Sequence, residues 1–204
     1  MPHTAGYFDS MFAADDDPWR FRSRWYESRK RAMTLACLTQ PRYASGFEPG
    51  CANGELSAAL ATRCDRLMVS DGSPRAVALA RARTSGSRHV QVQQAWVPHD
   101  WPDERFDLIV ISELGYFLSG GALEELVAKS KASLLAGGTV IACHWRRGSD
   151  DCEMNGDDVH ERLEEGLSLQ KVCCVMEADF RIDVWCEDSR SVAQREGFAP
   201  ADVG

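Results

Sequence analysis

Short apolar runs alternate with longer stretches of mixed polarity along most of the chain. Residues 106–112, Phe-Asp-Leu-Ile-Val-Ile-Ser, are apolar throughout their middle, which is typical of a parallel strand buried on both faces. The pattern predicts seven strands, at residues 44–48, 66–70, 90–95, 106–112, 139–144, 171–177 and 181–187. Helical stretches separate the first five strands, and the last two form a pair. This order predicts an α/β fold, a doubly wound seven-stranded mostly parallel sheet with an antiparallel edge.

Helix signals stand between these strands. Ser73 and Pro74 begin one helix, since serine caps free N–H groups and proline suits the first helical position. Gly137 and Gly138 are expected to end another helix, and Asp157 is expected to cap the last one. The first eighteen residues predict a loop or a short helix. Besides the helix that begins at Ser73, helices are predicted at residues 25–38, 55–63, 122–135 and 157–165.

Composition narrows the class of protein. With 204 residues, of which 44% are hydrophobic, the chain is expected to form one domain over residues 1–204. A net charge of -8 disfavours nucleic-acid binding, because phosphates require a basic surface. The sequence lacks signal-peptide and membrane-span patterns, so a cytoplasmic protein that does not enter the membrane is expected. Eight irregularly spaced cysteines indicate reduced thiols, and no metal site is expected. The local basic run is interpreted as a solvated helix face, at Arg20, Arg22, Arg24, Arg29, Lys30 and Arg31.

The strongest local motif is Phe-Glu-Pro-Gly-Cys-Ala-Asn-Gly at residues 47–54, which leaves a predicted strand and enters a predicted helix. Gly50 and Gly54 allow a ligand to come close to the backbone. The motif lacks the middle glycine of G-x-G-x-x-G, so a nucleoside with a small zwitterionic tail fits better than a pyrophosphate. Asp71 ends the next strand, where a carboxylate accepts hydrogen bonds from both ribose hydroxyls.

These features resemble the class I S-adenosylmethionine-dependent methyltransferases. The sequence resembles still more closely the nodulation protein S (NodS-like) methyltransferases, some of which N-methylate a deacetylated chitooligosaccharide. The resemblance spans roughly residues 7–187, nearly the whole chain. The closer match is carried by residues 17–21, 48–56, 101–102, 112–113 and 116–118.

The resemblance implies a set of cofactor contacts. Glu48, Gly50, Cys51 and Gly54 are expected around the methionine part of S-adenosylmethionine, and Asp71 at the ribose. Gly72 and Ser73 are expected beside the adenine, with Ser112 at the end of the fourth strand. Many class I enzymes bind adenine with an aspartate after the third strand, whereas this chain has Ala95 and Trp96 there. Trp96 either stacks on the adenine or anchors a surface loop.

The acceptor is expected at the ends of the fourth and fifth strands, where such sheets bind ligands. Glu113 or His144 is the predicted base that takes a proton from an ammonium acceptor. Two other interpretations are a helix cap for Glu113 and a histidine satisfied by the backbone for His144. His160 is expected at the surface. The remaining predicted acceptor contacts from these strand ends are Tyr116, Trp145 and Arg146.

Aromatic residues are concentrated in the N-terminal segment, at Trp19, Phe21, Trp25 and Tyr26. One hypothesis makes residues 1–40 a lid that excludes water, with Trp25 and Tyr26 against the acceptor. The other makes these side chains an aromatic staple that packs the first helix on the sheet.

The combined motifs predict an S-adenosylmethionine-dependent methyltransferase that releases S-adenosylhomocysteine. Its acceptor is expected to be an amino or hydroxyl group of a small polar molecule, such as an amino sugar or an oligosaccharide. An NAD-dependent oxidoreductase and a catalytically inactive adenosine-ligand-binding protein of the same fold are the alternatives. The sequence leaves the oligomeric state open.

Overall fold

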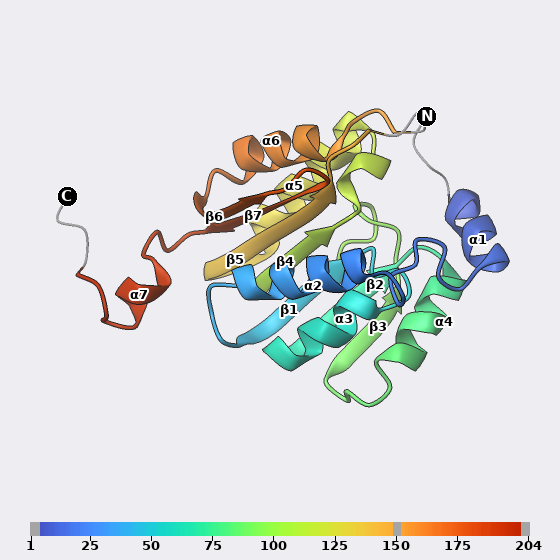
Figure 1. The fold of residues 1–204 in the computed structure, drawn as a ribbon, viewed down its shortest axis with the longest axis horizontal. Helices are drawn as coiled ribbons and strands as arrows, with labels where there is room; N and C mark the ends of the chain where they lie inside the picture. The colour runs from blue at the N-terminus through green and yellow to red at the C-terminus, as the bar shows by residue number, and fades with distance from the viewer. Residues whose placement is uncertain (1–4, 149–151, 201–204) are drawn as a thin grey trace.

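The computed structural model describes residues 5–148 and 152–200, and its centre is a seven-stranded sheet (Figure 1). The strand order is β3-β2-β1-β4-β5-β7-β6. Strands β1 to β5 are parallel, whereas β7 runs antiparallel to both of its neighbours. The predicted doubly wound sheet with an antiparallel edge is thus confirmed. The strands are β1 Tyr43–Pro49, β2 Cys64–Asp71, β3 Val90–Gln94, β4 Phe106–Ser112, β5 Leu134–Trp145, β6 Gln170–Met176 and β7 Phe180–Cys186.

Helices cover both faces of this sheet. The group α2, α3 and α4 packs on one face, and α5 and α6 pack on the other (Figure 1). The α-helices are α1 Ala5–Ala14, α2 Trp25–Cys37, α3 Glu55–Leu60, α4 Pro74–Arg83, α5 Gly120–Ser133, α6 Gly156–Leu167 and α7 Val192–Arg195. Two 3-10 turns, η1 Ala61–Arg63 and η2 Gly115–Phe117, complete the fold.

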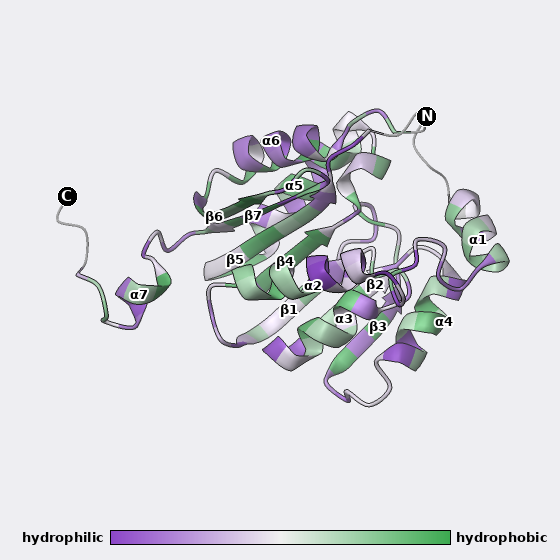
Figure 2. Cartoon of the chain, viewed as in Figure 1, coloured by the Kyte–Doolittle hydropathy of each residue, from purple (hydrophilic) through white to green (hydrophobic). Residues whose placement is uncertain are grey.

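The hydrophobic core has two parts, one on each face of the sheet, because successive side chains of a strand point to opposite faces. Leu108 and Val110 of β4 pack toward α2 and α3, while Ile109 and Ile111 pack toward α5 and α6. All four side chains are fully buried. The hydrophobic colouring of the central strands follows from this double burial (Figure 2).

Two predicted helix-boundary signals are wrong. Strand β5 already begins at Leu134, so Gly137 and Gly138 lie within a strand and do not end a helix. Helix α6 is capped by Asn155, which accepts a hydrogen bond from the Asp158 N–H at 3.0 Å, while the Asp158 side chain accepts one from the Asn155 N–H. This capping box satisfies two N–H groups at once, and the Asp157 side chain pairs with Arg146 instead.

The order of the strands determines where a ligand can bind. From β1 the chain winds outward to β2 and β3, and from β4 it winds the opposite way to β5. The loops after β1 and β4 therefore diverge and leave a crevice at the C-terminal ends of these two strands. No disulfide bond joins any of the eight cysteines, all of which lie among the described residues. Within residues 5–148 and 152–200, every helix is too short or too polar to cross a lipid bilayer.

Candidate active site

A cavity of about 680 Å³ opens at the C-terminal edge of the sheet. The ends of β1, β2, β4 and β5 form its floor, and side chains of α1 and α2 form much of its wall. Most of the residues predicted from the sequence to bind cofactor or acceptor line it, namely Tyr26, Glu48, Gly50, Cys51, Asp71, Gly72, Ala95, Trp96, Ser112, Glu113, Tyr116 and Trp145.

The glycine turn after β1 is a tight backbone structure. Gly50 and Gly54 have φ angles of 72° and 80°, and Ala52 between them has 49°. The Cys51 N–H donates to the Ser70 carbonyl at 2.9 Å, which ties the turn to β2. Gly54 is the N-cap of α3, and a Cβ atom there would lie 2.8 Å from Ala80 Cα. Gly54 therefore shapes the turn and the packing of α3 on α4 and does not form the cavity wall.

Replacing Gly54 with alanine is expected to lower the free energy of unfolding by about 2 to 4 kcal/mol, because the new Cβ atom meets backbone and the φ angle becomes strained. Urea denaturation measures the change. The control is Gly121→Ala in α5, where a Cβ atom has open space and helix propensity favours alanine by about 1 kcal/mol. Equal stability of the two variants would contradict this account of Gly54.

Two carboxyl groups face the cavity from β1 and β2, namely that of Glu48, which is buried, and that of Asp71, which is half-buried. The Asp71 side chain accepts hydrogen bonds from the Ala52 and Ser73 N–H groups, both at 2.9 Å. Burial raises the pKa of Asp71, and the two N–H groups oppose this shift. Glu48 accepts a hydrogen bond from Ser57 Oγ at 2.6 Å. Burial raises the pKa of Glu48 to about 8, so its carboxyl group is mostly protonated at pH 7.

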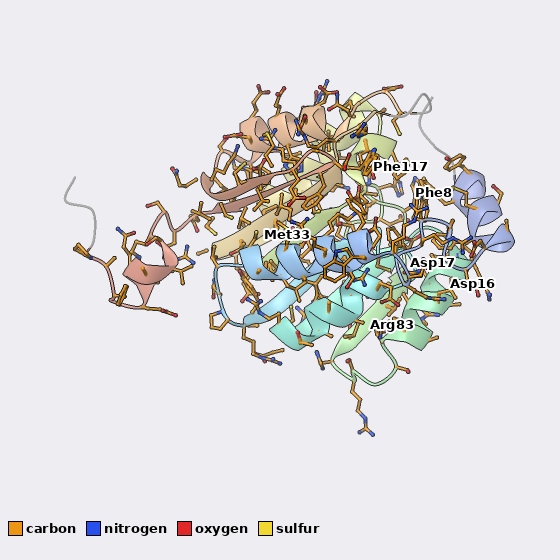
Figure 3. The ribbon with its side chains drawn as sticks, viewed as in Figure 1. Phe8, Asp16, Asp17, Met33, Arg83 and Phe117 are labelled. Carbon is orange, nitrogen blue, oxygen red and sulfur yellow. The ribbon has the colours of Figure 1, made fainter. Side chains whose placement is uncertain are left out.

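Trp96 forms the cavity wall beyond β3. Its ring lies directly on Gly72, where a Cβ atom would come within 2.0 Å of the indole. The backbone N–H of Trp96 donates to Asp100 Oδ2 at 2.9 Å, and this bond holds the loop after β3. Phe8 of α1 lies 6.2 Å from the Trp96 ring and 5.1 Å from Phe117, between centroids, and Phe8 and Phe117 are close to one another in Figure 3. Trp96 thus anchors a loop and lines the cavity as well.

An ionic cluster occupies the other end of the cavity. The Lys30 ammonium donates to Glu113 Oε1 at 2.5 Å and lies 3.0 Å from Glu27 Oε2. Glu113 Oε2 accepts hydrogen bonds from the Tyr116 hydroxyl and from the Trp145 N–H, the latter at 2.9 Å. Glu113 itself adopts a left-handed φ of 52°. Hydrogen bonds from Lys30, Tyr116 and Trp145 thus hold the Glu113 carboxylate in one orientation.

Burial and neighbouring charges both shift the pKa values of this cluster, and at Lys30 and Glu27 they act in opposite directions. Burial alone would lower the pKa of Lys30, but the neighbouring Glu113 and Glu27 carboxylates raise it above its ordinary value. Burial raises the pKa of Glu27, and Lys30 opposes that shift. Burial and the Glu113 carboxylate together raise the pKa of Tyr116. Lys30 therefore remains an ammonium group and is not a base at neutral pH.

The interpretation of Lys30 as part of a solvated basic face is wrong. Its side chain is only 6% exposed, and it lines the cavity with Tyr26 and Thr34. Residues 26, 30 and 34 are spaced by four, which places them on one face of α2. This helical spacing was the signal available in the sequence. It was obscured because Lys30 stands between two other basic residues, Arg29 and Arg31, both of which are half-buried.

Two histidines differ from their predictions. The sequence predicted His144 as a possible base and His160 as a surface residue. His144 is fully buried, and its Nε2 accepts a hydrogen bond from the Gly115 N–H at 3.1 Å. A ring nitrogen used in this way cannot take a proton from an acceptor, so the interpretation of a histidine satisfied by the backbone applies. His160 is also fully buried, against Asp183, and does not lie at the surface.

Three further residues that the sequence predicted to contact a ligand do not line the cavity that the described residues form. Trp25 is 75% exposed at the start of α2, whereas the next residue, Tyr26, is turned about 100° around the helix and contacts Phe180 of the sheet. Arg146 pairs with Asp157 of α6 and donates to the Glu177 carbonyl. Ser73 is buried as the N-cap of α4 and accepts from the Ala76 N–H.

The N-terminal segment is attached to the glycine turn. Asp17 is buried and accepts hydrogen bonds from the Phe21 N–H at 2.8 Å and from Asn53 Nδ2 at 2.9 Å. Asp16 and Asp17 lie beside α4 in Figure 3. Trp19 stacks on Phe21 with a centroid distance of 5.6 Å, and both line the cavity. The aromatic residues of this segment thus form cavity wall as well as packing.

The family comparison agrees with this geometry. The family model for nodulation protein S (NodS) matches residues 9–143, which include most of the N-terminal segment, the glycine turn, Asp71 and Glu113. This chain belongs to the nodulation protein S family. Among the described residues, no group of three His, Cys, Asp or Glu side chains is placed to hold a metal ion.

Individual relatives extend the comparison. Nodulation protein S of Rhizobium tropici is 35% identical over 126 residues, 61% of this chain and 53% of the relative. The chain spans about half the length of the curated NodS proteins that it matches. A crystal structure of a candidate methyltransferase from Pseudomonas syringae is 48% identical, with a TM-score of 0.72, and the match covers 80% of this chain and 99% of that one.

The fold itself is that of a solved NodS protein. N-methyltransferase NodS from Bradyrhizobium japonicum WM9, crystallised with S-adenosylhomocysteine, has a TM-score of 0.77 at 24% identity. The match covers 90% of this chain and 98% of that protein. The Rossmann-like methyltransferase fold predicted from the motifs is thus confirmed.

Proposed function

We propose that this protein binds S-adenosylmethionine in the cavity and transfers its methyl group to an amino or hydroxyl group of a small polar acceptor, such as an amino sugar or an oligosaccharide. The observation that carries the proposal is one continuous cavity with the glycine turn and Asp71 at one end and the Glu113 cluster at the other. Membership in the NodS family supports it.

The residues present fit this cofactor in chemistry and charge. The Asp71 oxygens each accept one backbone N–H and retain lone pairs for the two ribose hydroxyls. Glu48 faces the cavity beside the turn and suits the ammonium of the methionine part. Among the residues that line the cavity, six carboxyl groups, including Glu48 once it has released its proton, stand against four cationic side chains, which suits a ligand with net positive charge.

The acceptor end supplies orientation and a route for a proton. The bound cofactor supplies an electrophilic methyl group on a sulfonium, so alignment of the acceptor provides much of the rate. In our proposal Glu113 takes the proton that an ammonium acceptor must lose, and Lys30 holds its carboxylate in place. The Tyr26 hydroxyl is buried and has no hydrogen-bond partner in the part of the chain that the structure describes. It is available to the acceptor, and Trp145 provides an apolar face beside it.

The N-terminal segment acts as a lid in this proposal. Residues 5–40 contribute Phe8, Trp19 and Phe21 to the cavity wall, and Asp17 ties the segment to Asn53 of the glycine turn. Closure over both ligands excludes water from the reacting groups. Residues 1–4 of the lid predicted from the sequence lie outside the described residues.

The decisive experiment is calorimetric titration of the purified protein with S-adenosylhomocysteine, with NADH in parallel. Binding of S-adenosylhomocysteine without binding of NADH supports the proposal and excludes the dinucleotide alternative. Transfer of a radiolabelled methyl group is then screened with glucosamine, partly deacetylated chitooligosaccharides and small amines. Absence of S-adenosylhomocysteine binding would overturn the proposal. Binding without transfer to any acceptor would favour the inactive ligand-binding alternative.

Proton release provides a specific prediction for Glu48. Its pKa of about 8 means that the free protein holds this proton at pH 7, and a ligand ammonium beside it favours the charged form. Binding is therefore expected to release about one proton at pH 7, and affinity is expected to rise by up to about tenfold per pH unit between pH 6 and 8. Titration in buffers of different ionisation enthalpy measures the release. Glu48→Gln should abolish it, and an unchanged release would assign it to another group.

A further inference from the structure

A continuous run of hydrogen bonds connects α6 and β7 to the turn after β4. The Gly115 N–H donates to His144 Nε2 at 3.1 Å, and His144 Nδ1 lies 3.1 Å from His160 Nε2. His160 Nδ1 lies 2.8 Å from Asp183 Oδ2. The three side chains are fully buried, so water does not compete for these bonds.

Only one proton arrangement on two neutral rings satisfies every contact. The Gly115 N–H is a donor, so His144 Nε2 accepts and the proton of that ring lies at Nδ1. That proton is donated to His160 Nε2, which leaves the His160 proton at Nδ1, facing Asp183. Burial lowers the pKa of both histidines, which keeps both rings neutral at pH 7.

Asp183 anchors the far end of this run. Arg181 Nε donates to the same Asp183 oxygen at 2.7 Å, and the Lys171 ammonium lies 3.9 Å from it. Burial alone would raise the pKa of Asp183, but the hydrogen bond from His160 lowers it. Asp183 is therefore a carboxylate, and it orients the His160 ring as an acceptor toward His144.

The near end holds the turn that carries Glu113. Gly115 begins η2, and Tyr116 follows it. Val159 of α6 packs on this turn so closely that a Cβ atom on Gly115 would lie 2.4 Å from its Cγ1. Glu113 has an unfavourable left-handed φ, which persists only where the surroundings determine it. Helix α6 therefore restrains the turn twice, through Val159 and through His160.

We propose that His160 and Asp183 are positioning residues for methyl transfer, which act through His144 to hold Glu113 and Tyr116 at the acceptor end of the cavity. This proposal rests on the proposed function. In the described part of the chain His144, His160 and Asp183 stand behind the cavity wall and not in it, so their effect on the acceptor is transmitted by the turn.

The test compares two substitutions at His160. His160→Phe keeps an aromatic ring but removes the acceptor for His144, whereas His160→Gln offers a side-chain oxygen in its place. The Phe variant is expected to lose about 10- to 100-fold in kcat with partly deacetylated chitotetraose, with affinity for S-adenosylhomocysteine within about twofold of wild type. The Gln variant should recover most of the loss. Asp158→Ala, which removes one of the two capping-box hydrogen bonds of α6 without touching His160, is the control for helix stability.

Amide hydrogen exchange provides a readout that needs no acceptor. The Gly115 N–H reports the bond to His144, and the Trp145 N–H reports the position of the Glu113 carboxylate. Both should exchange faster in the Phe variant, while amides in the middle of β4 should not. Unchanged exchange at Trp145, or an equal fall in kcat in the Phe and Asp158→Ala variants, would overturn the positioning role. A wild-type protein that fails to bind S-adenosylhomocysteine would instead overturn the proposed function, and the exchange data would still test the run of hydrogen bonds.

Discussion

Replacing Asp71 with alanine is expected to weaken S-adenosylhomocysteine binding by about 10- to 100-fold, because hydrogen bonds to a charged group contribute about 1.5 to 3 kcal/mol. The substitution removes the proposed acceptor of the ribose hydroxyls. It also leaves the Ala52 and Ser73 N–H groups without their partner, which loosens the glycine turn. Calorimetric titration measures the affinity directly.

Two further variants separate these contributions. Asp71→Asn retains a side-chain oxygen for the turn but loses the charge and one acceptor, so it should bind more tightly than the alanine variant and more weakly than wild type. Asp65→Ala removes a carboxylate from the opposite end of β2, where it forms an exposed pair with Arg42, and should leave affinity unchanged. An alanine variant at position 71 with wild-type affinity would remove Asp71 from the cofactor site.

Glu113→Gln is expected to lower turnover by about 100-fold or more while changing affinity for S-adenosylhomocysteine by less than about threefold. Glutamine is nearly isosteric and still accepts from the Trp145 N–H, but it cannot take a proton from an ammonium acceptor. It also leaves the Lys30 ammonium with one carboxylate partner in place of two. Single-turnover transfer of radiolabelled methyl to the acceptor identified in the screen measures the effect.

The outcome must be distinguished from a loss of folding. Thermal unfolding of the variant measures the cost of leaving Lys30 partly unpaired. Lys30→Gln, which removes the cation and retains Glu113, separates the role of the ammonium from that of the carboxylate. Glu124→Gln in α5, an exposed position, is the control for loss of a negative charge. Turnover close to that of wild type would show that Glu113 is not the base.

The sheet and its topology follow from the sequence because they depend on local signals. Buried parallel strands such as β4 are apolar along their length, and Ser73 and Pro74 mark the start of α4 by chemistry that acts within one turn. The start of β5 was misplaced because Gly137 and Gly138 resemble a helix end. Here Gly137 has a positive φ inside a strand, which the type of residue alone does not reveal.

The proposed cofactor end of the cavity was also indicated by the sequence. Glu48, Gly50 and Asp71 lie at strand ends, and parallel strands bring their C-terminal ends to one edge of the sheet. The proposed acceptor end was only partly indicated. His144 stands at a strand end like Glu113, yet its ring turns toward the backbone of Gly115 and away from the cavity. The direction of a side chain at a strand end depends on what packs behind it.

The amino-acid sequence by itself determined the class of fold, the glycine turn and the carboxylate at the end of β2, since each depends on residues within one strand–helix unit. Only the tertiary structure decided which charged groups are buried together. Lys30 and Glu113 are separated by 83 residues, and His160 and Asp183 by 23, so their pairing depends on how α2 and α6 pack on the sheet. A buried charge is stable only beside a partner, and partners from different elements meet only when the chain has folded.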